Sequence, residues 1–247
     1  MAKSTRDYVM SLDLPDPGPP SYESAPDFTD SRQAVAVGSQ LTEFTAAVST
    51  DARSAISNSL LLAQLAANKA ANQAADVFAW YGKYCEVLQG VGWQSQDLDF
   101  QSQATTGQNL DVHKAIIPVI AAALGPAAAA ASIVLAVLNG LKDMNASSPW
   151  ITLFNRQSQH ASGAKFQVTY VDSDATGQPQ LTLLCFAVTA QQTLTQVLFF
   201  RFQNQRVELK QSTGKLGVTL DRLSGDRAAI AARVDSFIAD NIQNIEI

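Results

Sequence analysis

The sequence predicts an α+β fold, in which an antiparallel β-sheet of four to six strands is wrapped by layers of α-helices. The expected arrangement is a single domain with a disordered, proline-rich N-terminal tail. Residues 181–202 contain two unusually apolar strands in succession. Residues 31–142 are rich in alanine and repeat apolar side chains at helical spacing. Residues 222–243 again carry the pattern of an amphipathic helix.

Composition favours one well-packed domain. The chain has 247 residues, of which 47% are hydrophobic and 16% are charged. A net charge of −5 and a pI of about 4.9 argue against general nucleic-acid binding. The two cysteines and two histidines are too few for a disulfide framework and lack zinc-ligand spacing, so neither a metal nor another cofactor is expected.

Residues 1–30 are predicted to be a flexible tail, and residues 31–247 the folded domain. Five prolines fall between residues 15 and 26. The tail lacks the apolar segment of a signal peptide. The protein is therefore expected to be soluble when made, and to leave its cell by lysis, through a dedicated machine or inside a particle. Pro19, Pro20 and Tyr22 match the PPxY pattern that WW domains bind; a chance match and an export-related leader are the alternatives.

Residues 31–142 are expected to be mainly helical. Ala34, Val37, Leu41 and Phe44 recur at helical spacing after a capping residue at position 30 or 31. Further helices are predicted from Thr50 onward and across residues 70–88, with Cys85 as a core residue. Residues 92–109 are polar and without periodicity, which predicts a loop.

Residues 115–140 contain no charged side chain. The segment is long enough to be considered as a membrane span. Gly125 and Pro126 divide it, because glycine ends helices and proline begins them. We therefore expect a hairpin of two short apolar helices. It is either a permanent part of the core or a hairpin that can leave for a bilayer, and in both cases other elements are expected to cover it.

An antiparallel meander is predicted over residues 150–220. An apolar run at 150–154 comes first, and alternation then predicts a strand at 166–171 and a turn at 172–179. The apolar pair at 181–188 and 194–202 would form the centre of the sheet. Two more strands are expected on either side of a turn at 212–214, and Ser224 is expected to cap the last helix.

The sequence lacks the motifs of common enzyme classes. It has no nucleophile elbow, Walker loop, dinucleotide-binding glycine motif or HExxH zinc motif. Asp172 and Asp174 lie in a predicted turn, where carboxylates usually support the turn. We therefore do not expect an enzyme. The surplus of apolar helix and strand instead favours a protein whose helices move off the sheet, so that helices or strands enter a membrane.

The last 100 or so residues resemble the cytolytic delta-endotoxin (Cyt) family of bacterial insecticidal toxins. The order of segments is similar: an apolar helical pair, a Trp-led segment at 150–154, a strand at 166–171, and an apolar strand containing Leu184-Cys185. Gln196-Val197-Leu198-Phe199-Phe200 is the most similar short string. The resemblance implies a helix-wrapped antiparallel sheet, attack on phospholipid membranes without catalysis, and activation by trimming of the termini. Family members begin with a strand that helps to form a dimer, whereas helices are expected here.

The favoured hypothesis is a cytolytic toxin that binds phospholipid bilayers and inserts, or oligomerises on the membrane, to permeabilise them. The candidate lipid-contacting residues are Ile116, Ile117, Val119, Ile120, Ile133, Val134, Leu135, Val197, Leu198, Phe199 and Phe200. The candidate residues for head groups or a pore lumen are Arg201, Arg206, Lys210 and Lys215.

Two alternatives stay open at the level of sequence. A non-lytic virulence effector or lipid carrier would hold an acyl chain in its apolar interior, with Cys185 as the candidate attachment site. An adaptor protein would bind a WW-type partner through Pro19, Pro20 and Tyr22. Nucleic acid is not expected to be a partner in any of these hypotheses.

Overall fold

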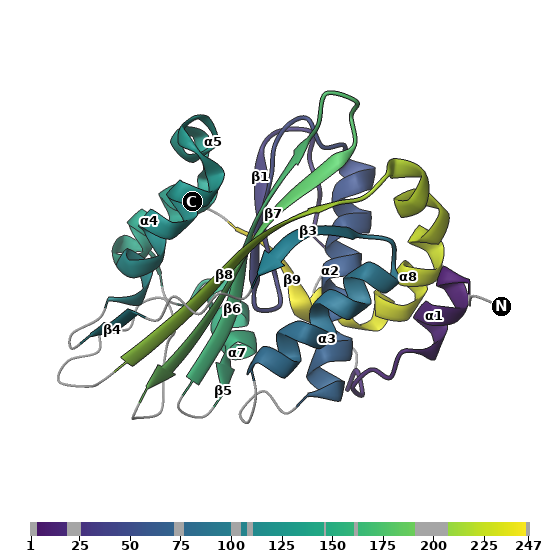
Figure 1. Ribbon diagram of the computed structural model, residues 1–247, viewed down its shortest axis with the longest axis horizontal. Helices are drawn as coiled ribbons and strands as arrows, with labels where there is room; N and C mark the ends of the chain where they lie inside the picture. The colour runs from purple at the N-terminus through teal and green to yellow at the C-terminus, as the bar shows by residue number, and fades with distance from the viewer. Residues whose placement is uncertain are drawn as a thin grey trace.

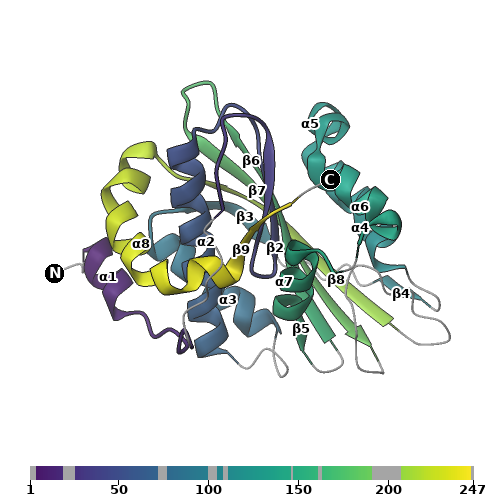
Figure 2. The same cartoon turned by 180° about the vertical axis from the view of Figure 1, so that it is seen from behind.

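One β-sheet runs through the middle of the protein and carries helices on both faces (Figures 1 and 2). The computed structural model describes residues 4–18, 26–71, 77–99, 105–107, 111–145, 147–160, 163–190 and 207–245. One face is covered by α1 (Thr5–Ser11), α2 (Thr50–Ala70), α3 (Val77–Gly90) and α8 (Leu220–Asn241). The other carries α4 (Val112–Leu124), α5 (Pro126–Ala131), α6 (Ile133–Gly140) and α7 (Pro149–Ser158). The predicted α+β fold class is confirmed.

The sheet is larger than expected, with nine strands in the described part of the chain. They are β1 (Gln33–Val37), β2 (Gln40–Phe44), β3 (Gln94–Asp99), β4 (Thr105–Gly107), β5 (Gln159–His160), β6 (Gly163–Ser173), β7 (Pro179–Ala190), β8 (Val207–Gly217) and β9 (Ile242–Asn244). The main path runs β3-β8-β7-β6-β2-β1-β9, while β4 pairs with β8 and β5 with β6. Strand β2 pairs with β6 in parallel, so the sheet is mixed.

The prediction that residues 181–188 lie at the centre of the sheet is confirmed. Strand β7 is hydrogen-bonded to β6 on one side and to β8 on the other. Its Leu183 and Cys185 contribute to the core under α2 and α3, while Leu184 and Phe186 contribute to the core under α4 and α6. The second strand of the predicted pair, at 194–202, lies outside the described residues.

The helix expected after residue 31 is instead the hairpin β1–β2. Val35 and Val37 face the helical layer of α2, whereas Ala34 and Ala36 face the layer of α4 and α6. Gly38 makes the turn with a φ of +55°. Because both faces of this hairpin are covered, it lacks polar alternation, and its apolar spacing was mistaken for a helical one. The helix predicted at these residues is therefore wrong, and β1 follows an earlier helix at Thr5–Ser11.

Four further local predictions are also corrected. The polar stretch at 92–109 contains β3 and β4, which pair with β8 through their backbones. The apolar run at 150–154 lies in a helix, α7, which Pro149 begins. The turn predicted at 212–214 is the middle of the continuous strand β8. The last helix begins earlier than expected, because Thr219 rather than Ser224 accepts the capping hydrogen bond from the backbone of Arg222.

Part of the predicted tail is ordered structure. Helix α1 lies against α3 and α8. Val9 is fully buried there, and Arg233 of α8 donates a hydrogen bond to the backbone oxygen of Leu12 at 2.5 Å. The beginning of the chain is therefore attached to the helical layer that lies opposite α4–α6.

Candidate functional site

The uncharged segment forms three helices where two were expected. Gly125 has a φ of +77°, which ends α4, and Pro126 begins α5. Ser132 then interrupts the chain again and caps α6, with its hydroxyl accepting a hydrogen bond from the backbone of Leu135. Helices α4 and α6 pack against each other, so the expected hairpin is present, with α5 at its tip. We call α4, α5 and α6 together the apolar hairpin.

One face of the apolar hairpin is part of the core. Ile116 and Ile120 of α4 and Val134 and Leu135 of α6 are buried, in the same cluster as Phe166 of β6. Ile117, Val119 and Ile133 are only half-buried. The structure therefore brings the seven hairpin candidates together, and it directs four of them toward the sheet.

The other face of the apolar hairpin is exposed, contrary to the expectation that other elements would cover it. Most of its exposed side chains are small and uncharged, and include Pro118, Ala122, Ala127, Ala130, Ala131 and Ala136, while Lys114 and Asn139 are exposed at its two ends. Alanine presents little apolar area to water, which explains why this face tolerates exposure. Among the described residues, no helix combines the length and the hydropathy of a membrane span.

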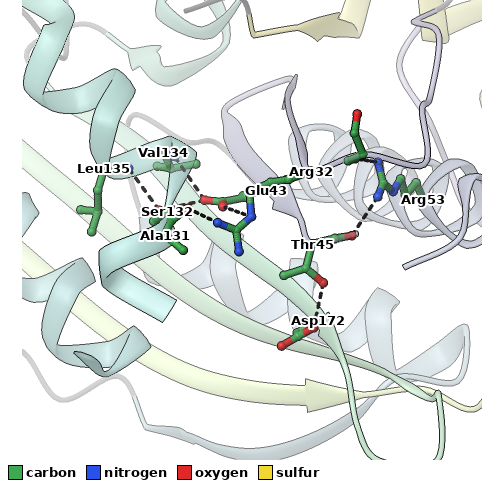
Figure 3. Close-up of polar contacts among 10 residues, drawn as sticks. Arg32, Glu43, Thr45, Arg53, Ala131, Ser132, Val134, Leu135 and Asp172 are labelled. Carbon is green, nitrogen blue, oxygen red and sulfur yellow. Dashed lines mark hydrogen bonds and ion pairs between the residues drawn. The ribbon is translucent and has the colours of Figure 1, made fainter. Parts of the chain in front are cut away.

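Glu43 joins the apolar hairpin to the sheet (Figure 3). This β2 residue is fully buried, and its side chain lies on the same face of the strand as that of Leu41. Its Oε2 accepts a hydrogen bond from the Ser132 hydroxyl at 2.8 Å and another from the backbone N–H of Val134 at 3.2 Å. The carboxylate thus lies at the N-terminus of α6, where negative charge is stabilised.

Arg32 connects the same carboxylate with the protein surface. Its Nε lies 3.6 Å from Oε1 of Glu43, and its guanidinium donates a hydrogen bond to the backbone oxygen of Ala131. The Arg32 side chain is 32% exposed, whereas that of Glu43 is 1% exposed. Sequence reasoning missed Glu43. The available signal was a single acidic residue within the otherwise uncharged run 33–50.

The candidate residues on β8 lie apart from the apolar hairpin. Lys210 lies on the α3 side of the sheet, where its ammonium group is 5.4 Å from the centre of the Phe78 ring and 3.3 Å from a Glu208 oxygen. Lys215 is exposed. The remaining candidates lie outside the described residues; these are Val197, Leu198, Phe199, Phe200, Arg201, Arg206, Pro19, Pro20 and Tyr22.

Cys185 lies beside a small cavity between α3 and the sheet. Phe78, Tyr81 and Lys210 also line this cavity, which has a volume of about 10 Å³. That volume holds about one water molecule, so an acyl chain does not fit in this conformation. Burial, together with the neighbouring Cys85 thiol, raises the pKa of Cys185 well above its usual value.

The comparisons with known proteins find a distant likeness of fold. No protein-family model and no curated protein matches the sequence. A delta-endotoxin structure is 15% identical over 84% of this chain and 91% of its own, with a TM-score of 0.43. The activated Cyt2Ba monomer from Bacillus thuringiensis subsp. israelensis is 16% identical over 60% and 86%, with a TM-score of 0.34.

The Evf virulence factor is 14% identical over 98% of this chain and 91% of its own, with a TM-score of 0.38. Similarity at this level does not place the chain in a sequence family.

Proposed function

We propose that this protein is a membrane-active cytolysin that binds phospholipid bilayers through its apolar hairpin and permeabilises them without catalysing a reaction. The exposed face of α4–α6 is the observation that carries the proposal. A surface helix normally directs charged side chains toward water. Here residues 115–140 direct alanine and proline outward instead. A surface of this kind is better matched to the boundary between lipid head groups and acyl chains.

Cationic side chains at the border of the apolar hairpin support a lipid partner. Lys114, at the start of α4, has a side chain that is 62% exposed, and its ammonium group lies 3.1 Å from an oxygen of Asp111. Arg32 lies beside the end of α5 and is one-third exposed. Apolar helical surfaces bordered by basic residues are typical of interfacial membrane binding.

Binding is proposed as the first of two steps. The exposed face first meets the bilayer, and the apolar hairpin then leaves the sheet, so that Ile116, Ile120 and Val134 also reach lipid. Once the hairpin has left, the apolar side chains of β7, β1 and β2 that it had packed against are uncovered. These newly exposed strands are the proposed contact for assembly with further copies on the membrane, which would permeabilise it.

Site-specific fluorescence tests the proposed orientation directly. A cysteine at the exposed position Ala127 of α5 would be labelled with an environment-sensitive nitrobenzoxadiazole dye. Ala228, exposed on α8 on the other side of the sheet, provides a matched alanine-to-cysteine control. With vesicles of phosphatidylcholine and phosphatidylglycerol, the dye at 127 should shift to shorter wavelengths and gain intensity, whereas the dye at 228 should not.

Dye release from the same vesicles, measured in parallel, tests permeabilisation. Rapid release together with the signal at position 127 is the expected result. A signal at 228 but not at 127 would show that a different face meets the membrane. Neither signal nor release, across several lipid compositions, would refute a direct action on lipid.

A further inference from the structure

Glu43 is the only acidic residue that is buried in the described part of the chain. It comes from β2, but the groups that its Oε2 accepts hydrogen bonds from both belong to the apolar hairpin, at Ser132 and Val134. Figure 3 shows the carboxylate between the N-terminus of α6 and the guanidinium of Arg32. A buried charge is tolerated only when it is paired and hydrogen-bonded, so this arrangement is tied to the docked position of the hairpin.

We propose that Glu43 is a latch, whose contacts with Ser132 and Val134 hold the apolar hairpin on the sheet and set the rate at which it moves into a membrane. This inference rests on the proposed function, since it concerns the regulation of the same site. It identifies an autoinhibitory contact within the fold.

The chemistry of the interface explains why a few polar contacts control the movement. Apart from the hydrogen bond from Arg32 to the backbone oxygen of Ala131, the hairpin packs against the sheet through apolar side chains, such as Ile116 and Leu138 in the core. Acyl chains replace such contacts with little loss, because lipid tails are about as apolar as leucine. They do not replace hydrogen bonds to a carboxylate. The Glu43 contacts therefore favour the docked state selectively over the membrane-bound one.

Release of the hairpin also lowers the desolvation cost of the Glu43 carboxylate, which remains on the sheet. Once α6 has left, the Glu43 carboxylate gains access to water and keeps Arg32 as a neighbour. On the side of the helix, Ser132 still accepts the capping hydrogen bond from Leu135. The Val134 N–H, by contrast, loses its acceptor when α6 leaves, so the barrier lies in breaking the Ser132 and Val134 contacts with Glu43 together.

The test compares rates of membrane entry in latch variants. Glu43→Gln removes the charge at nearly constant volume, and Ser132→Ala removes the hydroxyl donor from the other side. Thr45→Val is the matched control, because it removes a hydrogen bond between Thr45 and Asp172 at the end of the same strand, away from α6. Each variant would carry the fluorescent label at position 127.

Both latch variants should enter phosphatidylcholine–phosphatidylglycerol vesicles about tenfold faster than the parent, which corresponds to about 1.4 kcal/mol of the barrier. The control should enter at the parental rate. Hydrogen exchange without lipid should show faster exchange of the α6 amides in the latch variants, with unchanged exchange in β6 and β7. This readout separates local release from general unfolding.

The possible outcomes are distinct. If the parent gives the signal at 127 and the folded latch variants enter no faster, the latch is refuted and the proposed function stands. If the parent gives no signal with any vesicle, the proposed function fails first. If Glu43→Gln does not fold, Glu43→Asp decides in its place, because it draws the carboxylate away from Ser132 and Val134 while Ser132 still caps α6. Equal acceleration in Thr45→Val would overturn the latch, because it would show an effect of stability alone.

Discussion

The ammonium group of Lys165 lies 3.7 Å from the centre of the Trp80 ring, buried between α3 and the sheet. Its hydrogen-bond partner is the hydroxyl of Ser39, at 3.4 Å. Desolvation lowers the pKa of Lys165 to about 7. The helical layer opposite the apolar hairpin therefore has an interior that includes a titrating amine.

This amine makes the stability of the fold depend on pH. The unfolded chain holds its Lys165 proton up to a pKa of about 10.4, so it binds more protons than the folded protein above pH 7. The contribution of Lys165 to the free energy of unfolding should therefore rise by about 1.4 kcal/mol for each pH unit between about 7 and 10. Below pH 7 both states are protonated and this contribution stays constant.

Lys165→Met isolates the effect, because the cysteines and tyrosines titrate in both proteins. Urea unfolding should show the variant to be more stable than the parent at pH 7.5. The difference should shrink by roughly 2 kcal/mol at pH 9. A difference that stays constant between the two pH values would contradict the buried, neutral amine.

Arg53 of α2 joins both ends of the β1–β2 hairpin to the helical layer. Its side chain is fully buried, and it donates hydrogen bonds to the backbone oxygens of Val48 and Thr45 at 2.8 Å and of Ser31 at 2.6 Å. Arg53→Met should lower the free energy of unfolding by about 3 kcal/mol, because it leaves several buried carbonyls unpaired. Chemical denaturation measures this loss, and a loss below about 1 kcal/mol would argue against a stabilising role for the Arg53 hydrogen bonds.

The packing of α1 depends on the absence of a side chain at Gly90. A Cβ at this position would lie 2.1 Å from Cε1 of Tyr8. Gly90→Ala should therefore displace α1 and favour its local unfolding, so that trypsin cleaves after Arg6, which is already exposed, about tenfold faster. Gly82→Ala, in the same helix, is the control, since a Cβ there meets no atom within 4 Å. Equal cleavage of both variants would contradict the role of this contact.

Both thiols should react slowly in the folded protein. Burial raises the pKa of Cys85 to about 11, and it raises the pKa of Cys185 further above the ordinary range. Since the thiolate is the reactive form, alkylation at pH 8 should be roughly a hundredfold slower than that of a free thiol, and denaturant should restore the rate. Rapid labelling of the native protein would reveal an open route to one of the two sites.

Intact-mass measurement tests the lipid-carrier alternative at the same cysteine. The cavity beside Cys185 has room for about one water molecule. The mass of the purified protein should therefore equal that of the unmodified chain. An added mass equal to that of a fatty acyl group, lost on treatment with hydroxylamine, would favour the carrier over the cytolysin.

Sequence patterns predicted the layers of this fold better than its strand pairing. Strand β7 was correctly placed at the centre because a run that is apolar on both faces must be covered on both. The same property misled the prediction for residues 33–44, where valine and alanine fill both faces of β1. The sequence also predicted two short strands where β8 is one long strand. Ser212 and Gly214 favour turns in isolation, but here they pair with Cys185 and Leu183 in the sheet.

The site was predictable as a segment but not as a mechanism. Absence of charge marked the apolar hairpin, and the glycine–proline pair marked its bend. Glu43 could not be assigned to it, because the contact joins residues that are far apart in the sequence and depends on the hairpin β1–β2 being recognised as strands. A single acidic residue in an apolar run predicts that the carboxylate has a buried partner, but it does not predict which residue that partner is.

The parallel pairing of β2 with β6 determines the order in which the newly made chain can mature. Leu41 of β2 lies opposite Val168 of β6 in this pair, and the apolar hairpin lies between these two strands in the sequence. The hairpin therefore leaves the ribosome before β6 has been made and can complete the sheet. Strand β9, at the end of the described chain, then pairs with β1. Such long-range pairings form slowly and leave apolar surface uncovered in the meantime. Under the proposed function, a hairpin that is uncovered during synthesis would meet the membranes of the producing cell before the fold is complete.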